Sequence, residues 1–146
     1  MAASENGDDG RDRAQLDADL NVWAHTPDHM AFLNRWKRDS QLARTRTQVL
    51  RDQGYGRSSA ERMDIFPVRG ARAAPVLVFI HGGGWQSQDK SDVAFLAPPL
   101  VERGIGFVAL NHELAPRIPM PQMVRQVHRA LGVLHYQGAR WGFDPA

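Results

Sequence analysis

The sequence predicts an α/β protein with a mostly parallel sheet and helices on its faces. Two apolar segments, residues 75–80 and 105–110, are rich in β-branched and aromatic residues, which is typical of strands buried on both faces of a sheet. A helical segment lies between them and another follows the second. Strand, helix, strand and helix within about 70 residues indicate parallel strands joined by crossover helices.

The front of the chain divides into a leader and the start of one domain. Residues 1–20 are rich in Asp, Gly and Asn and lack apolar periodicity, so we expect a disordered leader. Residues 21–146 are expected to form the α/β domain. A helix is predicted over residues 27–51, because Thr26 suits an N-cap and Pro27 suits the first helical position.

The remaining elements follow from apolar pattern and turn residues. Pro98 and Pro99 are expected to kink the helix between the two apolar strands, and an apolar stripe with Gly138 behind it marks the last helix. The predicted strands lie near residues 62–68, 75–81 and 106–111, and the later helices near residues 92–103 and 121–138.

Composition excludes several classes of function. The chain has no cysteine, which excludes disulfides, thiolate nucleophiles and cysteine zinc sites. Residues 31–72 carry ten basic against four acidic residues, but no nucleic-acid-binding module accompanies them, so we interpret them as a solvated surface. No apolar run approaches the roughly 18 residues of a membrane span. The acidic, polar start does not resemble a signal peptide, and we expect a cytoplasmic protein.

The residues with chemical meaning are His81, Gly82, Gly83, Gly84 and Trp85, directly after a predicted buried strand. Glycine tolerates positive φ and lets the backbone approach a ligand closely, and successive N–H groups of such a loop can converge on one anion. A phosphate-binding loop would need Gly-Lys-Ser/Thr and a dinucleotide site Gly-x-Gly-x-x-Gly, and neither is present. The position matches the loop that forms half of an oxyanion hole in lipases and esterases.

Other candidate sites are weaker. Residues 56–60 read Gly-x-Ser-x-Ala, close to a nucleophile elbow, but they follow no apolar strand and run into a strand, so we predict a turn. His25 and His29 are four apart, and His128 and His135 seven apart, yet neither pair has the carboxylate of a zinc-binding His-Glu-x-x-His helix.

On these motifs the chain resembles the α/β-hydrolase superfamily, and within it the arylformamidase (kynurenine formamidase)-like branch and the hormone-sensitive-lipase-type esterases. The resemblance covers roughly residues 22–146. One departure is His112, where the family usually has Tyr after the Asn. The matching segments are residues 75–85, 89–92, 95–99 and 109–116, with residues 27–29 and 61–67 upstream.

The resemblance implies a role for each residue of the loop. Backbone N–H groups of Gly83 and Gly84 would stabilise the oxyanion of a tetrahedral intermediate, and His81 and Gly82 would support the loop. Trp85 would either line the substrate pocket or pack in the core. No metal and no organic cofactor is implied. The serine elbow and the rest of the triad come later in this fold, so we expect the chain to stop before the nucleophile strand.

Three hypotheses for function remain open. The first is a serine hydrolase of small esters or N-formyl aryl amines, whose partner is a small acyl substrate and to which this chain supplies the oxyanion loop. The second is a binding or interaction protein without catalysis, and the third is an inactive truncated fragment. Because half of a doubly wound sheet leaves an uncovered edge that favours pairing, we expect self-association through the incomplete sheet.

Overall fold

The structure is a computed structural model that describes residues 12–21 and 23–144. It comprises two compact units, Met1–Leu33 and Asn34–Ala146. In the first unit, α1 (Arg13–Asp19) begins at Asp12, whose carboxylate accepts the N–H of Gln15 at 2.7 Å. We predicted a disordered leader over residues 1–20. Its first eleven residues lie outside the described part, and residues 13–19 form α1.

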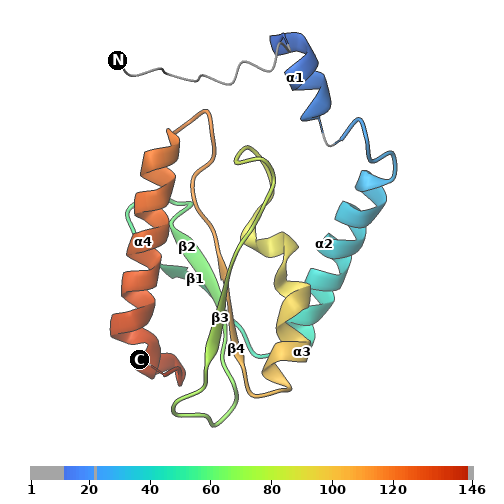
Figure 1. Cartoon of the computed structure of the whole chain (residues 1–146). Coiled ribbons are helices and arrows are strands. Elements are labelled where there is room, and N and C mark those ends of the chain that lie inside the picture. The colour runs from blue at the N-terminus through green and yellow to red at the C-terminus, as the bar shows by residue number, and fades with distance from the viewer. Residues whose placement is uncertain (1–11, 22, 145–146) are drawn as a thin grey trace, which may run out of the picture. The chain divides into compact units, whose positions relative to one another are not determined.

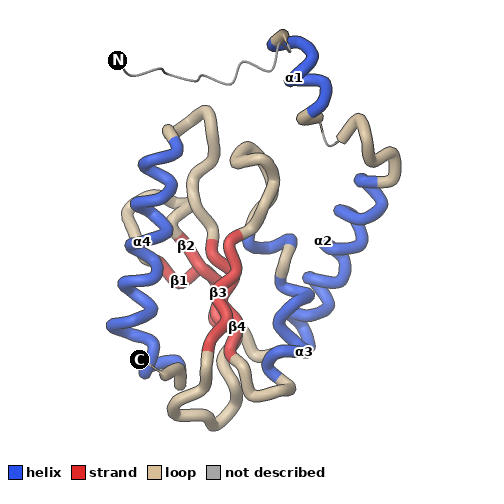
Figure 2. The backbone as a smooth tube through the Cα atoms, in the orientation of Figure 1, coloured by secondary structure: helices blue, strands red, loops and turns tan. Residues whose placement is uncertain are grey.

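The second unit is built on a four-stranded mixed sheet (Figures 1 and 2). The strand order is β1-β2-β4-β3, with β3 parallel to β4 and β2 antiparallel to both of its neighbours. The predicted parallel pair is therefore present, and two antiparallel pairs extend it. The strands are β1 (Leu50–Gly54), β2 (Arg62–Phe66), β3 (Val76–Ile80) and β4 (Gly106–Leu110).

Helices cover both faces of this sheet (Figure 1). The amphipathic helix α4 (Met120–Gln137) packs Ala130 and Leu134 against Ile65 and Val108 on one face. On the other face, α3 (Ala97–Val101) helps to cover the side chains of a second apolar cluster. All of β4 is buried, and each such buried Phe, Val or Leu contributes about 1.5–3 kcal/mol. The second cluster comprises Phe66, Val93, Ala94, Ala97, Phe107 and Ala109.

The helix predicted over residues 27–51 is wrong at its C-terminal end. Helix α2 (His29–Arg46) stops earlier, and Leu50–Gly54 forms β1 on the edge of the sheet. Leu50 pairs with Ile65 of β2, and a bulge follows at Asp52, whose φ is 55°. A bulged, mostly exposed edge strand has no apolar alternation, so its sequence carries no strand pattern.

The helix predicted near residues 92–103 is also shorter in the structure. Two 3-10 turns, Lys90–Asp92 and Ala94–Leu96, precede the five-residue α3. Pro98 and Pro99 occupy the first turn of α3, where proline fits, because neither residue has an N–H to donate to the preceding turn. The strand predicted near residues 62–68 ends at Phe66, directly before Pro67, which cannot donate to the ladder.

The sheet brings three chain segments to one edge. Ile80 of β3 lies opposite Leu110 of the parallel β4, so the residues that follow both strands meet at their carboxyl ends. Because β2 is antiparallel, it begins at the same edge, with Met63 opposite Leu110. This edge carries residues 81–85 and is where ligands bind in α/β sheets.

Candidate active site

The loop after β3 has a backbone that glycine makes possible. Gly83 has φ 110°, Gly84 60° and Trp85 64°. A Cβ on Gly83 would lie 2.3 Å from the carbonyl oxygen of Ser87, so a side chain there is excluded by both conformation and space. The Gly83 carbonyl oxygen accepts the N–H groups of Gln86 and Ser87, both at 3.1 Å, and the Ser87 hydroxyl at 2.8 Å.

Four successive amides of this loop have no acceptor among the described residues: no hydrogen bond there uses the N–H of Gly82, Gly83, Gly84 or Trp85. Unpaired amides at the carboxyl end of a strand are suited to a bound anion or a developing negative charge. The two predicted donors, Gly83 and Gly84, are thus available for hydrogen bonding.

His81 is buried at the base of the loop and is engaged at both ring nitrogens. Its Nε2 lies 3.1 Å from the side-chain oxygen of Asn111, at the end of β4, and its Nδ1 lies 2.9 Å from the Gly82 carbonyl oxygen. The Asn111 Oδ1 also accepts the backbone N–H of Lys90 at 3.3 Å. An orienting role for His81 requires contacts of this kind at its ring nitrogens.

Trp85 and His112 form an aromatic surface beside the loop. The rings of His81 and His112 stack with centroids 4.7 Å apart and planes 7° apart, and Trp85 lies 6.1 Å from His112. Trp85 is 48% exposed, which a residue packed in the core would not be. Its carbonyl oxygen accepts the N–H of Ala115 at 2.8 Å, so the loop is tied to the segment after β4.

The hydrogen bonding and the pKa shift of His112 were not predicted from the sequence. Its Nδ1 donates to the Glu113 carbonyl oxygen at 2.7 Å, and its buried Nε2 has no hydrogen-bond partner. Burial lowers the pKa of His112, and the nearby His81 lowers it further. The imidazole therefore favours the neutral form.

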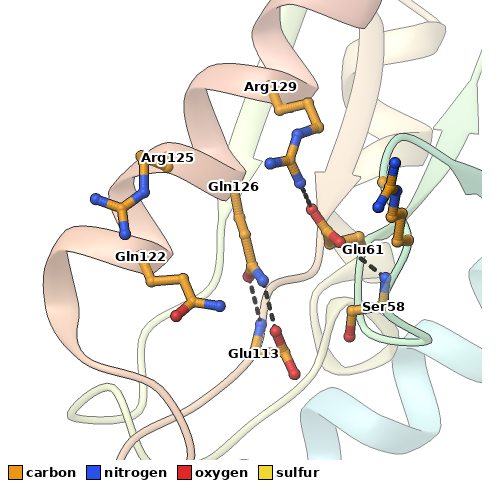
Figure 3. A pocket seen from close by; sticks show the side chains of 9 residues that line it. Ser58, Glu61, Glu113, Gln122, Arg125, Gln126 and Arg129 are labelled. Atoms are coloured by element: carbon orange, nitrogen blue, oxygen red, sulfur yellow. Dashed lines mark hydrogen bonds and ion pairs between the residues drawn. The ribbon is translucent and has the colours of Figure 1, made fainter.

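Two cavities open at this edge. One of about 380 Å³ lies beside Asn111 and His112, and Glu113 borders both it and a second cavity of about 710 Å³. Figure 3 shows the second cavity, where Gln126 bonds both to the backbone and to the carboxylate of Glu113. The other residues that line the larger cavity are Gly56, Arg57, Ser58, Glu61, Gln122, Arg125 and Arg129.

Ser58 in this larger cavity belongs to the Gly-x-Ser-x-Ala segment. It lies in the irregular connection between β1 and β2, and its hydroxyl oxygen accepts the N–H of Ala60 at 3.2 Å. Its own N–H donates to the carboxylate of Glu61, which is buried and also paired with Arg129. This is the geometry of a turn, as the sequence predicts, and differs from a strand-to-helix elbow.

An ion-pair cluster centred on the buried Lys90 and Asp64 supports the far end of the loop, and sequence reasoning missed it. Lys90 Nζ lies 2.8 Å from Asp64 of β2 and 2.9 Å from Asp52, while Arg44 Nε lies 3.5 Å from Asp64. Burial lowers the pKa of Lys90, but hydrogen bonds with the two aspartates outweigh it and raise the pKa above its usual value. The hydrogen bond from Lys90 lowers the pKa of Asp52. Lys90 is one of only two lysines beside sixteen arginines, a signal that could have singled it out.

The described part of the chain offers no alternative metal site. No group of three or more His, Cys, Asp or Glu residues in it could hold a metal ion. His29 of the first unit bonds the Thr26 carbonyl oxygen through Nδ1 at 2.7 Å, and His135 contacts Tyr136 edge-on. Nor does any helix in the described part have the length and apolar character of a membrane span.

Comparison with known proteins shows which family this chain belongs to. The BD-FAE family model matches residues 63–146. Kynurenine formamidase of Danio rerio is 36% identical over 102 residues, which are 69% of this chain and 35% of that protein. The chain thus spans about a third of the length of the kynurenine formamidases of Danio rerio and Salmo salar.

Solved structures show the same fold. A candidate thioesterase of Silicibacter sp. TM1040 superimposes with a TM-score of 0.77 at 23% identity, over 84% of this chain and 47% of that one. Esterase B of Lactobacillus rhamnosus gives a TM-score of 0.62 at 18% identity, over 90% of this chain and 42% of that one. The chain therefore belongs to the BD-FAE family and is a member of the α/β-hydrolase superfamily close to the arylformamidase-like and hormone-sensitive-lipase-like esterases.

Proposed function

We propose that this chain supplies the oxyanion-hole loop of a serine hydrolase that cleaves small carboxylic esters or N-formyl aryl amines. The observation that carries the proposal is the set of four unpaired amides, Gly82 to Trp85, at the carboxyl edge of the sheet. Membership of a hydrolase family and the likeness to kynurenine formamidases support the same chemistry.

In this mechanism a serine attacks the substrate carbonyl carbon and the carbonyl oxygen becomes an anion. The N–H groups of Gly83 and Gly84 would donate to that oxygen, and the residue after the serine would supply the other donor. Each such donor is worth roughly 3–4 kcal/mol in the transition state. No Gly-x-Ser-x-Gly occurs within the 146 residues, so in our proposal the nucleophile comes from polypeptide outside them.

The surroundings of the loop suit a small acyl or aryl group. Trp85 is half-exposed beside the His112 ring. The cavity of about 380 Å³ is lined by His112, by apolar residues such as Leu114 and Pro116, and by the charged residues Asp89, Glu113 and Arg117. The half-exposed Trp85 ring offers an apolar contact for an aryl or short acyl group.

A second candidate function, an interaction module, is favoured by the outer edge of β3. In the described residues β3 pairs with β4 on one side, and on its other side the pairing is limited to an isolated parallel bridge between Ala74 and Phe143. Leu77 and Ile80 of β3 are 41% and 40% exposed. An apolar strand with an unpaired edge accepts a further strand, so self-association of the isolated chain is the outcome expected from this hypothesis.

A chimera tests the proposed function. The 102 residues of Danio rerio kynurenine formamidase that align with this chain are replaced by the corresponding residues of this chain, and hydrolysis of p-nitrophenyl acetate and of an N-formyl aryl amine is measured. We expect a folded, active chimera that a fluorophosphonate labels, whereas the 146-residue chain alone is not labelled. A chimera that folds and takes the label on its serine but has no more hydrolysis than its serine-to-alanine variant would contradict the proposal. Light scattering of the chain alone tests the interaction module.

A further inference from the structure

We propose that Asn111 is a positioning residue that closes the loop over residues 82–89 through a single side-chain oxygen. The inference rests on the proposed function, because the loop that it closes carries the proposed oxyanion donors. Nothing in the sequence pattern assigns Asn111 this role. It follows from which atoms meet at the end of β4.

The Asn111 Oδ1 is bonded at both ends of the loop. His81, directly before the loop, approaches it through Nε2 at 3.1 Å, and Lys90, directly after the loop, donates its backbone N–H at 3.3 Å. Since the Lys90 amide is a donor, the Asn111 atom facing both groups is the oxygen, and His81 donates to it through Nε2–H. One acceptor thus holds the two ends of an eight-residue loop together.

Asn111 is itself fixed to the rigid part of the fold. Its backbone N–H donates to the Arg62 carbonyl oxygen at 3.0 Å, and its carbonyl oxygen accepts the hydroxyl of the buried Tyr55. Lys90 is fixed as well, because its ammonium group lies 2.8 Å from the buried Asp64 of β2. The two ends of the loop are therefore anchored to β2 and β4, the two central strands of the sheet.

The loop needs such an external support. Gly83, Gly84, Trp85 and Gln88 all have positive φ, and the internal bonds of the loop converge on the single carbonyl oxygen of Gly83. Oxyanion donors act only when they are held about 2.7–3.1 Å from the developing charge, and errors of about 1 Å cost roughly 100-fold in rate. Releasing both ends of the loop would therefore misplace its amides.

Two variants separate the hydrogen bonds from the shape of the side chain. Asn111→Leu keeps the volume but removes the acceptor, so both donors lose their partner. Asn111→Asp keeps an oxygen at the same place, and the nitrogen that it replaces makes no hydrogen bond within the described residues. Ser40→Ala is the control for stability alone, because the buried Ser40 hydroxyl accepts the Phe95 N–H at 3.1 Å, and both residues lie outside residues 82–89.

The experiment measures backbone ¹⁵N order parameters of the loop in the 146-residue chain, together with melting temperature. We expect order parameters of about 0.85 for residues 82–89 in the wild type and in Asn111→Asp, and below about 0.6 in Asn111→Leu. Ser40→Ala should lower the melting temperature but leave the loop ordered. Loop order unchanged in Asn111→Leu, or lost to the same extent in Ser40→Ala, would overturn the inference.

A titration of the same samples with dimethylarsinate, a tetrahedral oxyanion, tests the proposed function separately. We expect saturable downfield shifts of the Gly83 and Gly84 amide protons in the wild type, with at least about tenfold weaker binding in Asn111→Leu, because disordered donors must be ordered on binding. Absence of these shifts in a wild type with an ordered loop would overturn the oxyanion role. The order parameters decide the role of Asn111 on their own.

Discussion

The substitution Gly83→Ala tests the proposed oxyanion loop by adding one methyl group to it. Gly83 has φ 110°, outside the left-handed region that other residues tolerate, and the added Cβ would lie 2.3 Å from the Ser87 carbonyl oxygen. That oxygen belongs to the backbone, so it moves only if the loop moves. A carbon and an oxygen need about 3.3 Å, so we expect a displacement of about 1 Å.

The magnitude follows from these two effects. The unfavourable φ costs about 1–3 kcal/mol of stability. A displacement of about 1 Å at the donors costs roughly 100-fold in kcat, within the range of about 100- to 1,000-fold for loss of one oxyanion-hole donor. The reduction should appear in kcat more than in KM, because the donors act on the transition state.

The assay is the kinetics of p-nitrophenyl acetate hydrolysis by the chimera with Danio rerio kynurenine formamidase. Gly104→Ala is the matched control, because Gly104 also has positive φ, at 77°, but nothing lies within 4 Å of its added Cβ. We expect a comparable loss of stability from φ and an unchanged kcat in Gly104→Ala. A folded Gly83→Ala chimera with the kcat of the parent would refute the reasoning.

Three further predictions concern stability, measured by chemical denaturation of the 146-residue chain. His112→Phe should make the free energy of unfolding less dependent on pH. Burial lowers the pKa of His112 in the folded state, so the stability of the wild type is full above about pH 6.5 and falls as the pH decreases toward the folded-state pKa. An equal loss of stability between about pH 7.5 and 5.5 in both proteins would contradict this. Arg129→Met should cost about 1–3 kcal/mol of stability, because it leaves the buried Glu61 carboxylate without its ion-pair partner. The cost is moderate because solvent partly screens the half-exposed arginine. Adding Glu61→Gln should recover part of the loss, and no recovery would count against a charge effect. Ser40→Ala should cost about 1–3 kcal/mol by leaving the half-buried Phe95 N–H unpaired, and a cost below about 0.5 kcal/mol would show that this bond is replaced.

The part of the fold predicted from sequence is the part that apolar burial determines. Strand β4 and the helix α4 carry strong patterns, because β4 is buried throughout and α4 faces the core along one stripe. The sequence also predicts that residues 75–80 are buried on both faces, and this is wrong: β3 is only partly buried, with Leu77 and Ile80 exposed, because it lies at the end of the strand order and pairs with β4 alone. Edge strand β1 lacks that pattern. Its register depends on pairing Leu50 with Ile65, a partner fifteen residues away, so local sequence could not reveal it.

The same limit applies to the candidate site. The glycine loop could be predicted, because three glycines after a buried strand are a local signal. The contact between His81 and Asn111 spans thirty residues, and that between Lys90 and Asp64 spans twenty-six. These contacts arise from the strand order β2-β4-β3, which no local pattern specifies. The unpaired Nε2 of His112 is likewise visible only once its ring is stacked on His81.

The most direct test of the oxyanion role is a crystal structure of the chimera after its serine has reacted with a phosphonate. The phosphonyl oxygen then occupies the place of the oxyanion. We predict that it lies about 2.7–3.1 Å from the backbone nitrogens of Gly83 and Gly84, with His81 still bonded to Asn111. A phosphonyl oxygen turned to solvent, or bonded to groups outside residues 82–85, would contradict the assignment of this loop.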